Sequence, residues 1–329
     1  MKTHIPYSLL LATAATGMVF GAETAYTTPV GYDTKTLSTG KFNLVSLTLH
    51  NATTYAGLIT AESPSGVSFT GVDFNTLLSV GSVYILELPN GAIQEISSWT
   101  ATTLNTPQDI TASVTPNSTA IKLRKAATVS SVFGLTNTYG LTSDGDENLT
   151  NNDVLLVPNT NNAFDTVYYF NDGVTTGWFD DQGNSANNKV LNYGDGFFVQ
   201  RLATGSSISL VVAGEVKTKP TSSVIIPGFN FLGAVAPVGL SLGNSGLQAF
   251  LTIATNETQA TTTADLVLQQ QPNGTYRTAY YFNDGSTAGW FDDQGNTADD
   301  LILDSGFLIQ NKGVLKPVTL SVPASYSSL

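Results

Sequence analysis

A segment of seventeen residues occurs twice in this 329-residue chain, almost without change. The stretch YYFNDGVTTGWFDDQGN occupies residues 168–184 and YYFNDGSTAGWFDDQGN occupies residues 280–296, so fifteen positions are identical at an offset of 112. Self-similarity at a fixed spacing is the sequence signature of a repeated structural unit. The chain is therefore predicted to contain two related modules, each with the same hairpin-like segment.

Weaker matches on both sides of the repeated segment set the expected domain boundaries. GDGFFVQ at 194–200 corresponds to DSGFLIQ at 304–310. GKFNLVSLTL at 40–49 corresponds to PGFNFLGAVA at 227–236 at an offset of 187, so the first module carries an extra 187 − 112 = 75 residues. We expect a first module over residues 23–216 with an insertion at about 61–125, a linker at 217–223 and a second module over 224–329.

Short apolar runs bounded by Gly, Pro, Asn or Asp indicate strands along most of the chain, as in SVYILEL at 82–88 and DVLLVP at 153–158. Asn-Gly pairs in LPNGAI (88–93) and QPNGTY (271–276) predict tight hairpin turns. Only 126–136 and 241–255 have patterns that fit short helices. The predicted fold class is all-β: two tandem, related β-sandwich-like or barrel-like modules, the first with a β-rich insertion of about 75 residues.

The first 22 residues have the pattern of a secretory signal peptide, with Lys2 before a short apolar run. A membrane anchor is the alternative, but no basic stop-transfer flank follows the run, so we expect no transmembrane segment in the mature chain. The chain has no cysteine, and an exported protein without disulfides must be stabilised by its cores. A net charge of −12 with no basic run argues against nucleic acid as a partner.

The repeated hairpins allow two interpretations. Aromatic rings stack on sugar rings while nearby carboxylates bind the hydroxyls, so the hairpins could form two equivalent sugar-binding subsites. The candidate ligand-binding residues are Tyr169, Trp178 and Asp180 in the first hairpin and Tyr281, Trp290 and Asp292 in the second. Alternatively, turns and packing require these residues, and the segment marks the fold of the module. The pattern favours packing, and one residue of each Trp-Phe pair must face the core.

Calcium is the one cofactor for which the sequence offers candidate ligands. Clustered Asp and Asn oxygens at turns can coordinate this hard cation. In DGDENLTNND at 144–153 the candidate ligands are Asp144, Asp146, Asn148 and Asp153. The segment lacks the Gly and the distal Glu of an EF-hand loop, so the signal is weak.

Groups suited to catalysis are scarce in the sequence. Neighbouring carboxylates such as Asp180 and Asp181 point to opposite faces of a strand, so they do not form a catalytic pair. Beyond the signal peptide His50 is the single histidine, and a zinc site or a Cys-His dyad has no ligands to use. We expect the protein not to be an enzyme.

Several segments together resemble a known but uncharacterised family. TTPVGYDTKTLSTGKFNLVSLTLHNATTYAG, AIKLRKAATVSSVFG, GDGFFVQR and the Gly-Trp hairpin resemble secreted all-β proteins of Gram-negative bacteria with a TDPVGY-type mature start. The second module, with GFNFLGAVAP and GFLIQ, is similar to the GWNLIGNP…GQGFFV β-modules of bacterial surface proteins. The resemblance implies a fold and a location, outside the cell or in the outer cell envelope, and it implies no chemistry.

The expected function is therefore that of a non-enzymatic structural, assembly or adhesion protein, with the repeated Trp hairpins as a carbohydrate-binding alternative. The expected partners are further copies of the chain, paired through strand edges, or surface glycans.

Overall fold

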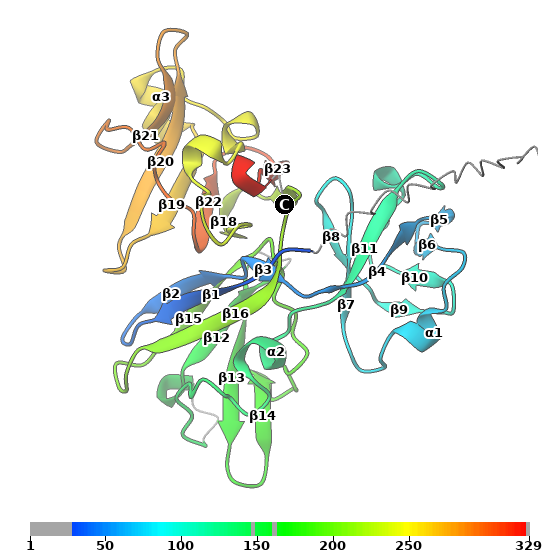
Figure 1. Ribbon diagram of the computed structural model, residues 1–329. Helices are drawn as coiled ribbons and strands as arrows, with labels where there is room; N and C mark the ends of the chain where they lie inside the picture. Colours follow the sequence, from blue (N-terminus) through cyan, green and yellow to red (C-terminus); the bar gives the residue numbers. More distant parts are fainter. Residues whose placement is uncertain (1–27, 146–148, 160–162, 327–329) are drawn as a thin grey trace, which may run out of the picture.

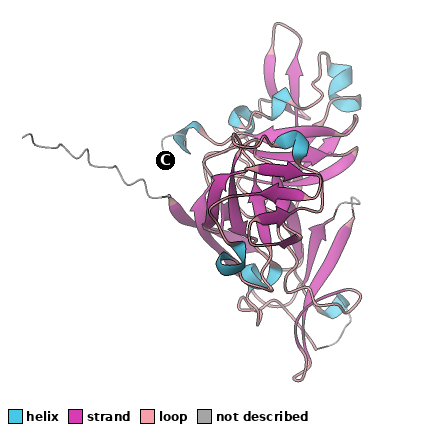
Figure 2. Ribbon diagram, turned by 90° about the vertical axis from the view of Figure 1, so that its right-hand side faces the viewer, coloured by secondary structure: helices cyan, strands magenta, loops and turns pink. Residues whose placement is uncertain are grey.

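The computed structural model describes residues 28–145, 149–159 and 163–326. Strand makes up 43% and helix 10%, which confirms the predicted all-β class. The sheets are antiparallel, and the short helices lie in the connections between strands (Figure 2). Figure 1 shows three parts: the first module, the unit inserted into it on the right, and the second module above it.

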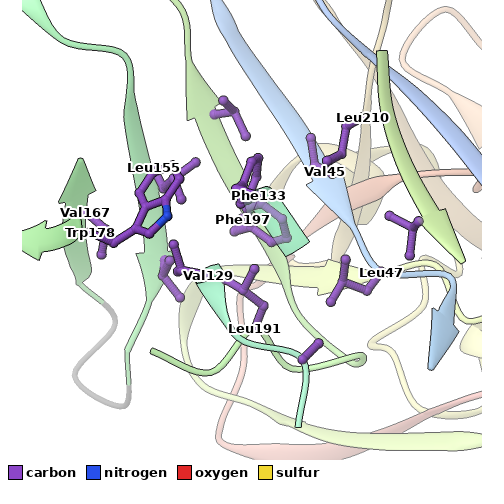
Figure 3. Close-up of a cluster of buried hydrophobic side chains, with 14 of the residues drawn as sticks. Val45, Leu47, Val129, Phe133, Leu155, Val167, Trp178, Leu191, Phe197 and Leu210 are labelled. Carbon is purple, nitrogen blue, oxygen red and sulfur yellow. The ribbon is translucent and has the colours of Figure 1, made fainter. Parts of the chain in front are cut away.

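The first module packs a five-stranded sheet, in the order β14-β13-β12-β15-β2, near a three-stranded sheet, β1-β16-β3. Alternation along β12 and β15 points Leu155, Val157, Phe197 and Val199 into one core, which Figure 3 shows with Trp178 and Phe133. The elements are β1 (Val30–Leu37), β2 (Phe42–Ser46), β3 (Leu49–His50), α2 (Val129–Phe133), η2 (Leu149–Asn151), β12 (Val154–Pro158), β13 (Phe164–Asn171), β14 (Thr176–Asp180), β15 (Gly196–Gln200) and β16 (Ile208–Val216).

The inserted unit has its own core between two four-stranded sheets, β4-β11-β7-β8 and β5-β6-β10-β9. Its elements are β4 (Thr53–Leu58), β5 (Ala61–Ser63), β6 (Gly66–Ser68), α1 (Phe74–Leu77), β7 (Tyr84–Glu87), β8 (Ile93–Glu95), β9 (Ser98–Trp99), β10 (Thr103–Asn105), η1 (Thr111–Ser113) and β11 (Ala120–Lys125). Because β4 pairs with β11, the unit already includes Thr53, and the predicted start at about residue 61 is too late.

The second module contains the five-stranded sheet β21-β20-β19-β22-β18 and the strand pair β17-β23 around a separate core. Its elements are β17 (Thr221–Ile225), β18 (Gly228–Gly233), η3 (Leu242–Asn244), η4 (Leu247–Ala249), α3 (Glu257–Thr262), β19 (Leu266–Gln270), β20 (Tyr276–Asn283), β21 (Ala288–Asp292), β22 (Gly306–Asn311), β23 (Lys316–Leu320) and η5 (Ala324–Tyr326). The predicted Asn-Gly turns join β7 to β8 and β19 to β20, and Gly91 and Gly274 have φ of 88° and 87° as such turns require.

The two modules fix their edge strands with the same side chain. Asn43 Oδ1 accepts from the backbone N of Ser38 at 2.8 Å, and its Nδ2 donates to the carbonyl of Val199 at 3.1 Å. Asn230 is the equivalent residue in the second module. Its Oδ1 accepts from the backbone N of Ile226 at 2.9 Å, and its Nδ2 donates to the carbonyl of Ile309 at 3.3 Å. The Asn of each matched Phe-Asn pair in the sequence thus holds its strand, β2 or β18, at the edge of its sheet.

The modules meet through glycines that let two backbones approach. A Cβ atom on Gly196 would lie 2.8 Å from the carbonyl oxygen of Leu232, and one on Gly306 would lie 3.1 Å from that of Val45. Gly196 and Gly306 occupy equivalent positions in the two modules, as do Val45 and Leu232. The contact is therefore approximately twofold, like the isologous interface of a dimer.

Candidate functional site

The repeated hairpins are β13–β14 and β20–β21, and their tryptophans face the two cores. Trp178 is 0% exposed and Trp290 is 1% exposed. Tyr169 and Tyr281 pack against them at a steep angle, with ring centroids 5.3 and 5.5 Å apart. In each Trp-Phe pair the tryptophan is therefore the core residue, and the phenylalanine lies on the other face of the sheet.

This burial corrects the predicted role of the two tryptophans in sugar binding. A sugar stacks on an exposed ring face, and neither indole has one. The Nε1 atom of Trp178 donates a hydrogen bond of 2.8 Å to the carbonyl of Gly134, directly after α2. The Nε1 atom of Trp290 has no partner among the described residues. Tyr169 is buried as well, so the hairpins are packing elements of their modules.

Asp180 and Asp292 close the turn that follows each hairpin. Their Oδ1 atoms accept from the backbone N of Asn184 and Asn296, both at 2.8 Å. Hydrogen bonds from Asn184 hold the pKa of Asp180 below its usual value. Burial opposes ionisation of Asp292, but the hydrogen bonds from Asn296 outweigh it, and the pKa of this carboxyl is also lowered. Both carboxylates are ionised and engaged by their own turns, so their predicted role as sugar ligands has no support in this geometry.

The predicted calcium ligands do not form a site among the described residues. Asp153 is 1% exposed, and its Oδ2 atom accepts from Arg201 Nε at 2.7 Å. Two backbone N–H groups also donate hydrogen bonds to this carboxylate, each at 2.7 Å. Asp153 is therefore an ion-paired anchor rather than a free metal ligand. The backbone N of Asp144 donates to a neighbouring side chain at 3.1 Å. Asp146 and Asn148 lie outside the described residues, and within the described part no group of three His, Asp or Glu residues could hold a metal ion.

The second module repeats the anchor at Asp265, which directly precedes β19 as Asp153 precedes β12. Its carboxylate forms an ion pair with Lys316 and accepts from the backbone N of Thr252 and Lys312 at 2.7 and 2.8 Å. An acidic residue at this position therefore ties the start of a central strand to its neighbours in both modules.

A buried cluster of charges joins the first module, the inserted unit and the linker. Arg124 on β11 is 2% exposed; its Nε donates to Glu87 Oε2 at 3.1 Å, and it also pairs with Glu215 of β16. Lys217, 4% exposed, pairs with Glu87, and His50 lies beside them. No local pattern in the sequence indicates this cluster, because Glu87 and Lys217 are 130 residues apart. The signal that could have found it is a Glu near the end of each of two otherwise apolar strands, Glu87 in β7 and Glu215 in β16.

His50 and Glu87 titrate far from their ordinary values in this cluster. Burial, helped by the positive charge of Arg124, lowers the pKa of His50 to about 3. Burial opposes ionisation of Glu87, but Lys217 outweighs it and the pKa falls to about 2. The His50 ring packs on Tyr193 at 5.3 Å, and its nitrogens have no hydrogen-bond partner among the described residues. Near neutral pH the imidazole of His50 is therefore uncharged and the carboxylate of Glu87 is ionised. The ion pairs of the cluster hold three parts of the chain together.

Two accessible hollows lie side by side at the boundary between the modules. The first, here called the aromatic cleft, has a volume of about 500 Å³ and is lined by Gly40, Lys41, Phe42, Leu156, Phe164, Phe198, Gln270, Gly274 and Tyr276. The second, here called the polar groove, has a volume of about 750 Å³ and shares Lys41 and Gln270 with the cleft. No local pattern in the sequence indicates either hollow, because the walls of each come from different modules.

Compared with family models, curated proteins and solved structures, the chain matches none of them. Within residues 28–145, 149–159 and 163–326, no helix is long and apolar enough to cross a membrane.

Proposed function

We propose that this chain is an exported, non-enzymatic structural or adhesive protein of the outer cell envelope or extracellular space, and that it assembles with further copies through a sheet edge. The observation that carries the proposal is the edge of β1 that pairs with no other strand among the described residues. This strand lies at the end of its sheet, and Val30 and Tyr32 are 75% and 78% exposed. Unpaired backbone groups along an exposed strand are a template for pairing with another chain.

The protein covers other edges that would otherwise be open. On β2, the backbone N of Leu44 donates to Gln270 Oε1 at 2.8 Å, and Gln270 Nε2 donates to the carbonyl of Phe42 at 2.9 Å. On β18, the backbone N of Gly233 donates to the carbonyl of Gly194 at 2.9 Å. Groups from the other module thus form hydrogen bonds with the backbone along the edges of β2 and β18. The contrast with the first half of β1 supports a role for β1 in assembly.

The roles of the buried ionisable groups support a function without catalysis. Asp153 and Asp265 anchor central strands through Arg201 and Lys316. His50 is held neutral by burial within the charged cluster. General acid–base catalysis favours a pKa near the working pH, and the pKa of His50 lies well below it. These groups stabilise the fold.

Light scattering on purified residues 23–329 tests the assembly. We expect the average mass to rise with protein concentration. Val30→Lys with Tyr32→Lys should keep the chain monomeric, because charged side chains on an edge strand oppose pairing. Val174→Lys is the matched control, since Val174 is 92% exposed on the turn between β13 and β14 and far from β1 in sequence.

A constant monomer mass at all concentrations would rule out self-assembly. If instead the Val174 variant lost assembly as fully as the β1 variant, the contact would lie elsewhere and the role of β1 would be wrong. Circular dichroism of each variant checks that the fold is retained.

A further inference from the structure

The aromatic cleft exposes ring faces that neither core uses. Phe42, at the start of β2, is 44% exposed, and Tyr276, at the start of β20, is 37% exposed. Phe42 packs edge-on against Phe198 at 5.9 Å, and Phe198 lies 6.0 Å from Phe164. Clustered exposed apolar side chains on a soluble protein commonly mark a binding surface. The cleft therefore offers an aromatic platform open to solvent.

The rim of the cleft is polar and held in place. Lys41 donates to the carbonyl of Pro272, which joins the β1–β2 turn of the first module to the β19–β20 turn of the second. The Gln270 amide is fixed on the edge of β2 by two hydrogen bonds. A rim fixed in this way lowers the ordering cost of binding a ligand.

The polar groove continues from this rim with groups that bind hydroxyls. Its charged lining residues are three acidic and three basic: Asp33, Asp300, Asp304, Lys35, Lys41 and Arg277. Gln269 and Gln271 lie in the same wall. Carboxylates, amides and a guanidinium can each form paired hydrogen bonds. Because the charges balance, the groove gives no overall preference to an anion or a cation.

The equivalent side of the approximate twofold has a polar groove of its own, of about 630 Å³, but it lacks the polar rim of the cleft. Gly228 stands where the first module has Lys41, and Pro158 stands where the second module has Gln270. Phe164 stands at the position of Tyr276; it lines the same cleft, and its ring packs on Phe231 at 4.8 Å. The polar rim therefore occurs on one side only, as expected of a binding site rather than of a packing requirement of the fold, whereas an exposed phenylalanine stands on both sides, at Phe42 and Phe229.

We propose that the aromatic cleft and the polar groove together bind a neutral oligosaccharide. One sugar ring lies with its apolar face on Phe42 and Tyr276, and the hydroxyls of the neighbouring units bond to Asp300, Arg277 and the glutamine amides. A sugar combines apolar ring faces with many hydroxyls, which matches an aromatic cleft beside a charge-balanced polar groove. A fatty acid or another purely apolar ligand would leave the polar groove unused.

Isothermal titration calorimetry of residues 23–329 with cellohexaose, chitohexaose and maltohexaose tests this site. We expect at least one hexaose to bind, and Tyr276→Ala and Phe42→Ala each to weaken that binding by about tenfold, the upper end of what an aromatic contact contributes. Tyr276→Phe keeps the ring and should bind nearly as well as the unmodified chain. Phe229→Ala is the matched control: Phe229 occupies the position of Phe42 in the second module and is 43% exposed.

Several results would overturn the proposal. No heat of binding with any of the three hexaoses at millimolar concentration would remove it. Equal weakening by Phe42→Ala and Phe229→Ala would show that the effect is not local to the cleft. If octanoate bound in the cleft and no hexaose did, the site would be one for apolar ligands. Urea unfolding of Tyr276→Ala and Phe42→Ala separates a lost contact from a lost fold.

Discussion

Replacing His50 with Phe tests how the buried charges act on stability. Five groups surround the imidazole: Arg124, Glu87, Lys217, Glu215 and the Tyr193 ring. Burial and Arg124 lower its pKa from 6.5 to about 3 in the folded chain. Between these two values the unfolded chain binds a proton at His50 and the folded chain does not. The stabilisation is therefore fully present above pH 6.5 and decreases as the pH falls toward 3.

The size of the effect follows from one proton per molecule. A difference of one bound proton changes the free energy of unfolding by about 1.4 kcal/mol per pH unit. From pH 6.5 to 4.5 the chain should lose roughly 2 kcal/mol of stability through His50 alone. Glu87, with its pKa lowered from 4.5 to about 2, contributes stability that is lost only as the pH falls through that lower range. Glu87 therefore adds little above pH 4.5, and comparing the unmodified chain with a His50 variant cancels the other groups, such as Asp195, whose pKa burial raises.

His50→Phe removes the titration while keeping a ring of similar size on Tyr193. At pH 7 we expect its stability to change by less than about 1 kcal/mol, because the ring nitrogens of His50 have no hydrogen bonds to lose among the described residues. Between pH 6.5 and 4.5 the variant should lose about 2 kcal/mol less than the unmodified chain. Urea unfolding at pH 7, 5.5 and 4.5, followed by tryptophan fluorescence, measures both effects.

Nuclear magnetic resonance gives an independent reading of the same residue. Residues 23–329 contain one histidine, so the imidazole signal needs no assignment. A signal that titrates near pH 6.5 in the folded chain would refute the reasoning. The same conclusion would follow if His50→Phe lost as much stability on acidification as the unmodified chain.

Three further experiments, with five substitutions, test the packing. Trp178→Phe should destabilise the chain by about 1 kcal/mol more than Trp290→Phe, because only Trp178 donates a hydrogen bond from its indole among the described residues; urea unfolding of the two variants compares them directly, and equal losses would contradict this. Arg201→Met should cost roughly 3–5 kcal/mol by leaving Asp153 buried without its cation. Lys316→Met should cost less, since Lys316 is 18% exposed and Arg201 is 2% exposed; thermal melts give the order, and the reverse order would be evidence against it. Gly196→Ala should destabilise the contact between the modules by roughly 1–3 kcal/mol, because its Cβ would press on the Leu232 carbonyl; an unchanged unfolding midpoint would show that the modules move apart freely.

Local patterns predicted the strands and turns well, since they depend on neighbouring residues. The Asn-Gly turns and the hairpin around Trp178 follow from short stretches of chain. The side of the hairpin that faces the core cannot be predicted from such short stretches. It depends on the pairing of Tyr169 with Trp178 and on the register of β13 with β12. The start of the inserted unit was placed too late for a similar reason. β4 joins it by pairing with β11, a distant part of the chain.

Non-local pairing also explains why Asp153, one of the predicted calcium ligands, forms an ion pair in the structure. The acidic run 144–153 has suitable oxygens, but the sequence around Asp153 gives no sign of Arg201, which lies 48 residues away. The residues of the charged cluster were missed for the same reason. Burial turned these charges into ion pairs, and burial is a property of the packed molecule rather than of a short window of sequence.

The place of the proposed sugar site follows from how two related modules are joined. Trp178 and Trp290, which the two modules bury in their own cores, are identical in the two copies, as are most of the turn residues around them. The aromatic cleft takes Phe42 from one module and Tyr276 from the other, so it exists only where the modules meet. The glycine contact that joins them is approximately twofold and would by itself create two similar hollows. Lys41 and Gln270 make the two differ. In such a chain, positions where the copies agree indicate the fold, and positions at the contact where they differ are where a ligand site should be sought.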